Sequence, residues 1–101
     1  MKVINFVEHK HFVEYNKEYT QHLFKFPNGY GASVVRNQYS YGGEVGLFEL
    51  AVLDEYDELT YNTPITNDVL GWLSEGDVLR TLNRIEELTK PKLQLEHQID
   101  K

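Results

Sequence analysis

The sequence predicts an α+β domain in which a small antiparallel sheet of about four strands carries one C-terminal helix packed across it. Three observations predict this fold: apolar runs separated by short turns, a strongly hydrophobic stretch at residues 47–53, and a helical apolar pattern that begins after residue 74. Short turns favour antiparallel neighbours, and one late helix argues against repeated parallel crossovers. The length of 101 residues suits a single domain at 1–91 with a polar tail at 92–101.

The first 21 residues alternate loosely between apolar and polar side chains, which is compatible with two short strands or with one strand and an irregular segment. His9, Lys10 and His11 form a small basic cluster in this region. We interpret the cluster as a solvated turn in preference to a metal or catalytic site, because two histidines without a recognisable third ligand do not make a zinc pattern.

A β-hairpin around Asn28 and Gly29 is the clearest local pattern in the sequence. Apolar runs at 22–26 and 32–36 flank this dipeptide, and Asn-Gly supplies the positive φ angles of a tight turn. Turn formation is sufficient to explain both residues, so the sequence gives no reason to assign a function to the loop tip.

The segment 37–46 is a predicted loop with three glycines among its last five residues. Such a density of glycine predicts unusual backbone angles or the close approach of another group. The loop does not match a phosphate-binding loop, which requires a lysine after the glycines and a following helix. Tyr39 and Tyr41 could present a flat amphipathic surface to a partner or pack along a sheet edge.

Residues 47–53 form a predicted central strand, since the stretch is apolar on both faces. Phe48, Leu50 and Val52 share one face, and Glu49 lies on the other face with the remaining apolar side chains. The segment 54–58 contains four carboxylates and is the predicted turn of a second hairpin, which continues into a strand at 59–61. This turn must be solvated because buried like charges repel one another.

A single helix is predicted at 74–89, after Pro64 has ended the strand region and 69–73 has formed a short apolar turn. Ser74 and Asp77 have the spacing of a capping box. Lys90-Pro91 closes the helix, and Arg80, Arg84, Glu86 and Glu87 face water. The apolar positions at helical spacing are Val78, Leu79, Leu82, Ile85 and Leu88.

The hydrophobic core is predicted to form where the strand faces meet this helix. Its expected members are Phe24, Phe26, Val34, Phe48, Leu50, Val52, Trp72, Leu79, Leu82 and Ile85.

Negative charge is concentrated in the middle of the chain, although the net charge is only −6. The 43 residues between Arg36 and Arg80 contain no lysine, arginine or histidine. They contain nine carboxylates: Glu44, Glu49, Asp54, Glu55, Asp57, Glu58, Asp68, Glu75 and Asp77. A field of one sign steers basic partners and repels nucleic acid and anionic membranes.

The predicted partner-binding surface is centred on the acidic turn, which combines long-range steering with Tyr56 as an aromatic contact. Its residues are Asp54, Glu55, Tyr56, Asp57 and Glu58, with help from Glu44, Glu49, Tyr39 and Tyr41. The alternative for each of these residues is an ordinary solvated surface position.

Catalytic and cofactor motifs are not recognisable in this sequence, so we expect no enzymatic activity, no cofactor and no metal. Cysteine is absent, the serines lack a nucleophile-elbow context, and the acidic turn lacks the alternating ligands of a calcium loop. No apolar run approaches the roughly 20 residues of a membrane span, and the N-terminal segment becomes charged too early for a signal peptide.

Four segments resemble a family of small proteins encoded by tailed bacteriophages and prophages. They are GYGASVVR at 29–36, YSYGG at 39–43, GLFELAVL at 46–53 and YNTPITNDV at 61–69. With the helix that follows, the resemblance covers about residues 28–88. It implies a phage origin and a location in the cytoplasm of the host bacterium, and it supplies no functional residues.

Two functions of different classes are consistent with these features. The first is an inhibitor that binds a basic host protein, such as a defence nuclease, by occupying its nucleic-acid channel through charge mimicry. The second is a structural or assembly accessory that self-associates through the aromatic loop, with a merely solvated acidic face. Neither function involves direct binding of nucleic acid or membrane, and a homo-oligomer is compatible with both.

Overall fold

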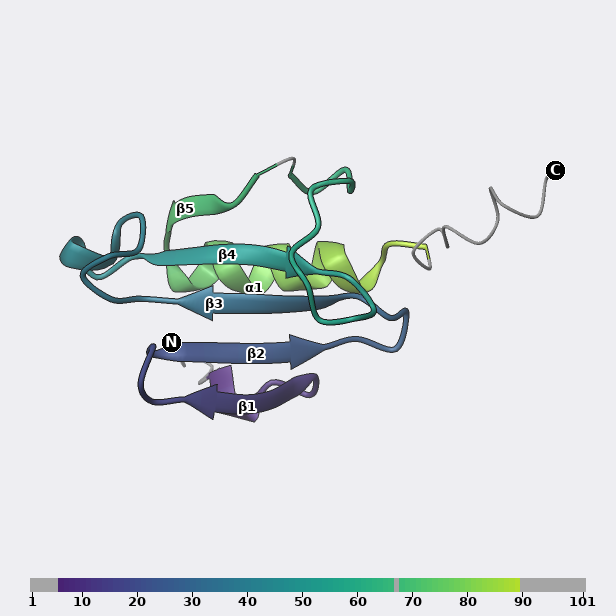
Figure 1. The fold of residues 1–101 in the computed structure, drawn as a ribbon, viewed down its shortest axis with the longest axis horizontal. Coiled ribbons are helices and arrows are strands. Elements are labelled where there is room, and N and C mark those ends of the chain that lie inside the picture. The colour runs from purple at the N-terminus through teal and green to yellow at the C-terminus, as the bar shows by residue number, and fades with distance from the viewer. Residues whose placement is uncertain (1–5, 67, 90–101) are drawn as a thin grey trace, which may run out of the picture.

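The computed structural model describes residues 6–66 and 68–89 (Figure 1). Five strands form one antiparallel sheet in the order β1-β2-β3-β4-β5, and one helix lies across a face of this sheet. The strands are β1 (Phe12–Asn16), β2 (Gln21–Lys25), β3 (Gly31–Val35), β4 (Phe48–Leu53) and β5 (Leu70–Leu73). The helices are α1 (Glu75–Glu86) and two short 3-10 helices, η1 (Phe6–Glu8) and η2 (Gly43–Val45).

The α+β class and the single C-terminal helix are confirmed, and the sheet has five strands where about four were expected. The predicted strand at 59–61 is wrong: among the described residues, an isolated antiparallel bridge between Leu53 and Leu59 takes its place. The additional strand is β5, in a segment for which the sequence predicted an apolar turn. β5 pairs with β4 through a register shift between Phe48 and Leu50, and this irregular pairing leaves only a four-residue strand. An apolar run of this length cannot be assigned to a strand or a helical turn by periodicity.

The predicted hairpin is formed by β2 and β3, with Phe24 paired to Ala32. The Phe26 amide donates to the Tyr30 carbonyl at 2.8 Å, so the loop between these two residues consists of 27–29. It is longer than the two-residue Asn-Gly turn that the sequence suggested. Gly29 has φ 99°, whereas Asn28 keeps a negative φ. The glycine alone therefore supplies the left-handed backbone at this turn.

The core lies between α1 and one face of the sheet, with Phe6 from η1 packed beside Phe24 and Phe48. Of the expected core members, seven are buried: Phe24, Phe26, Val34, Leu50, Val52, Leu82 and Ile85. Phe48 and Leu79 are partly buried at the edge of the core. Ala32, Ile65 and Val78 are further buried members.

Trp72 was wrongly predicted to be a core residue, since 62% of it is exposed. Its backbone has φ 58°, in the left-handed region, between Leu70 and Leu73, which both pack against the core. Positions three residues apart in a regular strand point to opposite faces, but the irregular β4–β5 pairing brings Leu70 and Leu73 to the same face. Trp72 is left on the outside.

Helix α1 begins with the predicted capping box, in which the Ser74 hydroxyl accepts from the Asp77 amide and the Asp77 carboxylate accepts from the Ser74 amide. The helix ends at Glu86, earlier than the expected residue 89. The side-chain amide of Asn28 donates to the carbonyls of Ile85, Glu86 and Leu88 at 2.8, 3.2 and 3.0 Å. The hairpin loop thus caps the helix, a role of Asn28 beyond its turn chemistry. Lys90-Pro91 and the 92–101 tail lie outside the described residues.

Candidate functional site

The basic cluster near the N-terminus lies in a turn, as expected, but this turn is only partly solvated: Lys10 is exposed, whereas His9 and His11 are half-buried. The imidazole Nε2 of His11 lies 3.0 Å from a carboxylate oxygen of Glu86, and Lys10 Nζ lies 3.7 Å from the same oxygen. His9 Nδ1 accepts from the His11 amide, and its ring meets Phe24 edge-on. Glu86 is therefore partly covered and paired, contrary to the expectation that it faces water. The hydrogen bond with His11 is the main cause that lowers the pKa of Glu86.

A metal site is not formed by these histidines, because no group of three or more potential ligands comes together in residues 6–66 and 68–89. The cluster instead joins the segment before β1 to the end of α1. We therefore assign the cluster a structural role as a tertiary contact.

His22 should make the stability of the protein sensitive to mild acid. Its Nδ1 is buried without a hydrogen-bond partner in the described structure, and burial followed by the charge of Arg36 lowers its pKa below 6.5. A lowered histidine pKa contributes stability that is present above about 6.5 and is lost as pH falls through the folded-state value. His9 acts in the same direction, because burial and then the His11 charge lower its pKa as well.

We expect the urea midpoint of the wild type to fall between neutral pH and about pH 5, and we expect His22→Phe to reduce this fall. Phenylalanine suits the site, since the His22 ring lies among Phe6, Phe12 and Tyr15. His9→Gln serves as a second variant with a smaller expected change, because His9 keeps a nearby Glu86 charge that raises its pKa. An unchanged pH dependence in His22→Phe would contradict the role assigned to this side chain.

The acidic turn at 54–58 is held by its own first carboxylate. Asp54 accepts from the amides of Tyr56 and Glu58 at 2.8 and 3.0 Å, and Asp57 adopts φ 64°. The Asp57 carboxylate lies 3.0 Å from Lys25 Nζ, so the turn is tied to β2 across the sheet. Glu55 and Glu58 make no hydrogen bond or ion pair through their side chains within the described residues. Tyr56 is 72% exposed.

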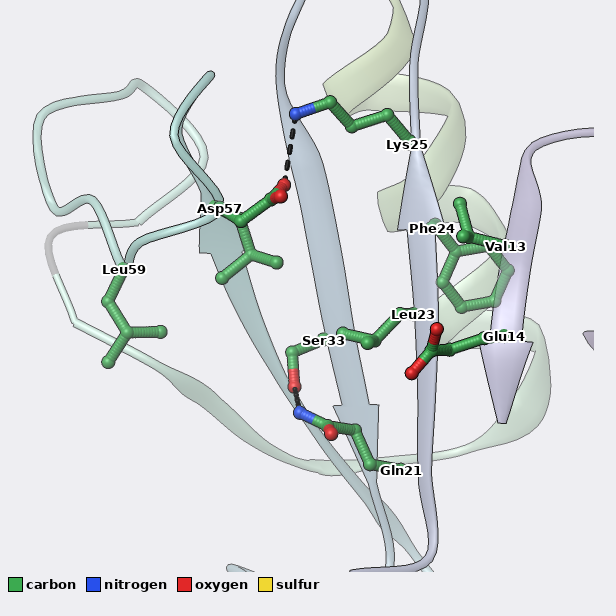
Figure 2. A pocket seen from close by; sticks show the side chains of 10 residues that line it. Val13, Glu14, Gln21, Leu23, Phe24, Lys25, Ser33, Asp57 and Leu59 are labelled. Atoms are coloured by element: carbon green, nitrogen blue, oxygen red, sulfur yellow. Dashed lines mark hydrogen bonds and ion pairs between the residues drawn. The ribbon is translucent and has the colours of Figure 1, made fainter. Parts of the chain in front are cut away.

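A groove of about 630 Å³ lies beside this turn, on the sheet face opposite α1. Figure 2 shows Asp57 and Leu59 on one side of the groove, Val13 and Glu14 on the other, and Ser33 between them. The groove is mainly apolar, with the Lys25–Asp57 ion pair and a 2.7 Å hydrogen bond from Gln21 to Ser33 among its polar groups. These polar groups satisfy one another, and they do not form a nucleophile with an adjacent base.

The glycine-rich loop between β3 and β4 confirms both predictions made from its composition. Gly42 has φ 90°, and a Cβ there would lie 2.9 Å from the Cα of Trp72. Two hydrogen bonds fix the part of the loop around Tyr41: the Trp72 amide donates to the Tyr41 carbonyl at 3.1 Å, and the Tyr41 amide donates to the Glu49 carboxylate at 2.8 Å. Tyr39 is 86% exposed and Tyr41 is 60% exposed, and Glu44 is also exposed.

The nine residues predicted to bind a partner form two separate surfaces. The acidic turn follows the end of β4, whereas the aromatic loop precedes its start, so the two lie at opposite ends of this strand (Figure 1). Five residue steps of about 3.3 Å separate the strand ends by about 17 Å. Sequence reasoning missed Trp72 as an exposed neighbour of Tyr41. Gly71 was the available signal, because a Cβ at this position would lie 2.5 Å from the Cβ of Tyr41.

Comparison of this chain with protein-family models, with curated proteins and with solved structures gave no match. No helix within residues 6–66 and 68–89 has the length and apolar character needed to cross a membrane.

Proposed function

We propose that this chain is a phage or prophage protein that binds a basic host protein, with carboxylates taking the place of nucleic-acid phosphates. Its main support is the distribution of charge in the fold. None of the nine carboxylates between residues 37 and 79 is buried, and the same segment contributes no cation. This segment includes β4, β5 and the loops at both ends of β4, so the surface around these elements attracts basic partners.

The carboxylates differ in how free they are to meet a partner. Asp54, Asp57 and Glu49 accept hydrogen bonds within the fold. Glu44, Glu55, Glu58 and Glu75 have no side-chain hydrogen bond or ion pair among the described residues. Because these four keep their full capacity to accept, they are the expected contacts for lysine and arginine side chains.

The span of this acidic surface suits a channel that follows a nucleic-acid strand. The ends of β4 lie about 17 Å apart, which corresponds to about five nucleotides of one strand of a duplex at about 3.4 Å each. Such channels are lined with lysine and arginine, and a rigid set of carboxylates competes for them. The proposed setting is the cytoplasm of the host bacterium, and we expect neither enzymatic activity nor direct binding of DNA.

The double variant Glu55→Gln and Glu58→Gln should slow association with the partner and flatten the salt dependence of binding. These two carboxylates are free in the turn, so their removal changes charge without disturbing its hydrogen bonds. Rim charges act mainly on the association rate, which falls with ionic strength. The measurement is surface plasmon resonance at several salt concentrations, with a partner captured from bacterial lysate by the wild type after nuclease treatment.

A matched control is Glu8→Gln with Glu18→Gln, since both carboxylates are exposed and lie outside the cation-free segment. It removes the same charge and should leave the association rate nearly unchanged. The proposed function would be refuted if every lysate protein retained by the wild type were retained equally by the variant with Glu55→Gln and Glu58→Gln. Retention that disappears on nuclease treatment would refute it equally, because the captured species would be held by nucleic acid.

Self-association as an assembly accessory is the second candidate, and the edge strand β1 favours it. β1 is the first strand in the sheet order, and Val13 and Tyr15 are exposed on it. An exposed strand edge is a ready template for pairing with another chain. Light scattering after size exclusion, over a range of protein concentrations, distinguishes a dimer from a monomer. A monomer at all concentrations would exclude this function.

A further inference from the structure

We propose that Trp72 and Tyr41 form an aromatic platform that receives an arginine side chain of the basic partner. The inference rests on the proposed function and adds to it the surface and the side chain that are recognised. It places the main contact at the start of β4, at the opposite end of the strand from the acidic turn.

The two aromatic residues are brought together by close contact between two glycine-containing segments. The Trp72 amide donates to the Tyr41 carbonyl at 3.1 Å. A side chain at Gly42 would meet the Trp72 backbone, and one at Gly71 would meet the Tyr41 side chain. Both aromatic side chains are nevertheless more than half exposed. The fold therefore holds two large rings at its surface on backbones that are fixed relative to each other.

The backbone of Trp72 is costly for a residue of this type. Its φ of 58° lies in the left-handed region, which bulky side chains rarely occupy and which glycine or asparagine adopts at low cost. Burial of the ring in the core does not offset this strain, since 62% of Trp72 is exposed. Backbone strain at an exposed tryptophan points to a role in binding, because tryptophan and tyrosine dominate the energetics of protein interfaces.

Charge around the platform favours a cation. The Glu49 carboxylate accepts a hydrogen bond from the Tyr41 amide, and exposed Glu44 directly follows Gly42 and Gly43. Arg36, which follows β3, brings one positive charge to this end of β4, but its guanidinium carbon already lies 4.9 Å from the centre of the Phe48 ring, and the two carboxylates outnumber it. A guanidinium can stack on an aromatic face and pair with a carboxylate at the same time, which an ammonium does less well.

A second copy of this chain is a poorer occupant of the platform. Two copies would each bring Glu44 and a net charge of −6 to the contact. Like charges at an interface oppose association, whereas a basic partner gains from the same groups.

The test uses oligoarginine and oligolysine peptides of equal length at low ionic strength, with affinity measured by calorimetry. Trp72 is the only tryptophan in the chain, so its fluorescence also reports directly on the platform. We expect the wild type to bind oligoarginine more tightly than oligolysine, with a change in tryptophan emission for oligoarginine. Trp72→Asn should weaken oligoarginine binding by about five- to tenfold, as the loss of a cation–π contact does.

Asparagine tolerates the left-handed backbone, so Trp72→Asn should keep or raise the wild-type urea midpoint. Tyr61→Asn is the matched control, because it removes an exposed aromatic side chain that is outside the nine predicted partner-binding residues. Unchanged oligoarginine affinity in Trp72→Asn, or equal losses in the two variants, would overturn the platform. If the platform variant binds normally while Glu55→Gln with Glu58→Gln binds weakly, the platform is wrong and the proposed function stands. If the wild type binds neither peptide and captures no protein from lysate, both are wrong.

Discussion

Replacing Leu82 with alanine should lower the free energy of unfolding by about 2–4 kcal/mol, as the removal of a buried leucine side chain from a packed core does. Leu82 has no exposed surface, and it belongs to the cluster in which α1 meets the sheet. Truncation removes buried apolar surface and leaves a cavity that the neighbouring strands fill only in part. Urea denaturation followed by circular dichroism measures the effect.

Leu59→Ala provides the matched control, because the same chemical change is made at a leucine that is 52% exposed. We expect a loss of only about 0.5 kcal/mol at this surface position. Equal midpoints for Leu82→Ala and the wild type would show that the apolar stripe of α1 does not face the sheet. Equal losses in the two leucine variants would show that general changes in helix or turn stability outweigh core packing.

Local patterns were sufficient to predict most of the fold. The capping box at Ser74 and Asp77 and the helical spacing of Val78, Leu82 and Ile85 are signals within one segment, and α1 follows them. The alternation in β4 also places Leu50 on the correct face. Each of these elements has its cause within a few neighbouring residues.

Trp72 and β5 could not be predicted in the same way, since their conformation depends on partners elsewhere. A tryptophan in an apolar run is highly buried on average, but Trp72 is exposed because Leu70 and Leu73 are the residues of β5 that pack against the core. The register shift in the β4–β5 pair is likewise a property of two strands together. Neither strand alone carries a signal for it.

In the candidate site, too, the composition could be predicted from the sequence and the long-range contacts could not. The concentration of acidic residues was visible in the sequence, but the use of Asp57 to bind Lys25 was not. Glu86 was expected to face water because the helical pattern places it there, yet His11 reaches it from a distant segment. Long-range ion pairs of this kind cannot be read from spacing along the chain. The free carboxylates could be separated from the occupied ones only in the folded structure.

Asn28 should be the most sensitive polar position in the fold, and its aspartate variant should be less stable than its alanine variant at neutral pH. The Asn28 amide group donates to three carbonyls at the end of α1, and its oxygen accepts from the Tyr30 amide at 3.0 Å. Alanine removes both functions and should cost about 1–3 kcal/mol, the range for partly buried polar groups that lose their partner. Aspartate keeps the acceptor but directs negative charge at carbonyl oxygens and at the negative end of the helix dipole.

The pH dependence separates this electrostatic cause from a general loss of packing. Carbonyl oxygens around an aspartate at position 28 disfavour its charged form, so its folded pKa should rise above the usual value of about 3.9. A carboxyl group with a raised pKa destabilises the fold above that pKa, and the penalty decreases as pH falls through it. We therefore expect the stability difference between Asn28→Asp and Asn28→Ala to shrink between neutral pH and about pH 4 in urea denaturation. Asn62→Asp, at an exposed loop position, should show almost no loss. If Asn28→Asp were as stable as the wild type at neutral pH, the side-chain amide of Asn28 could not be the cap that ends α1.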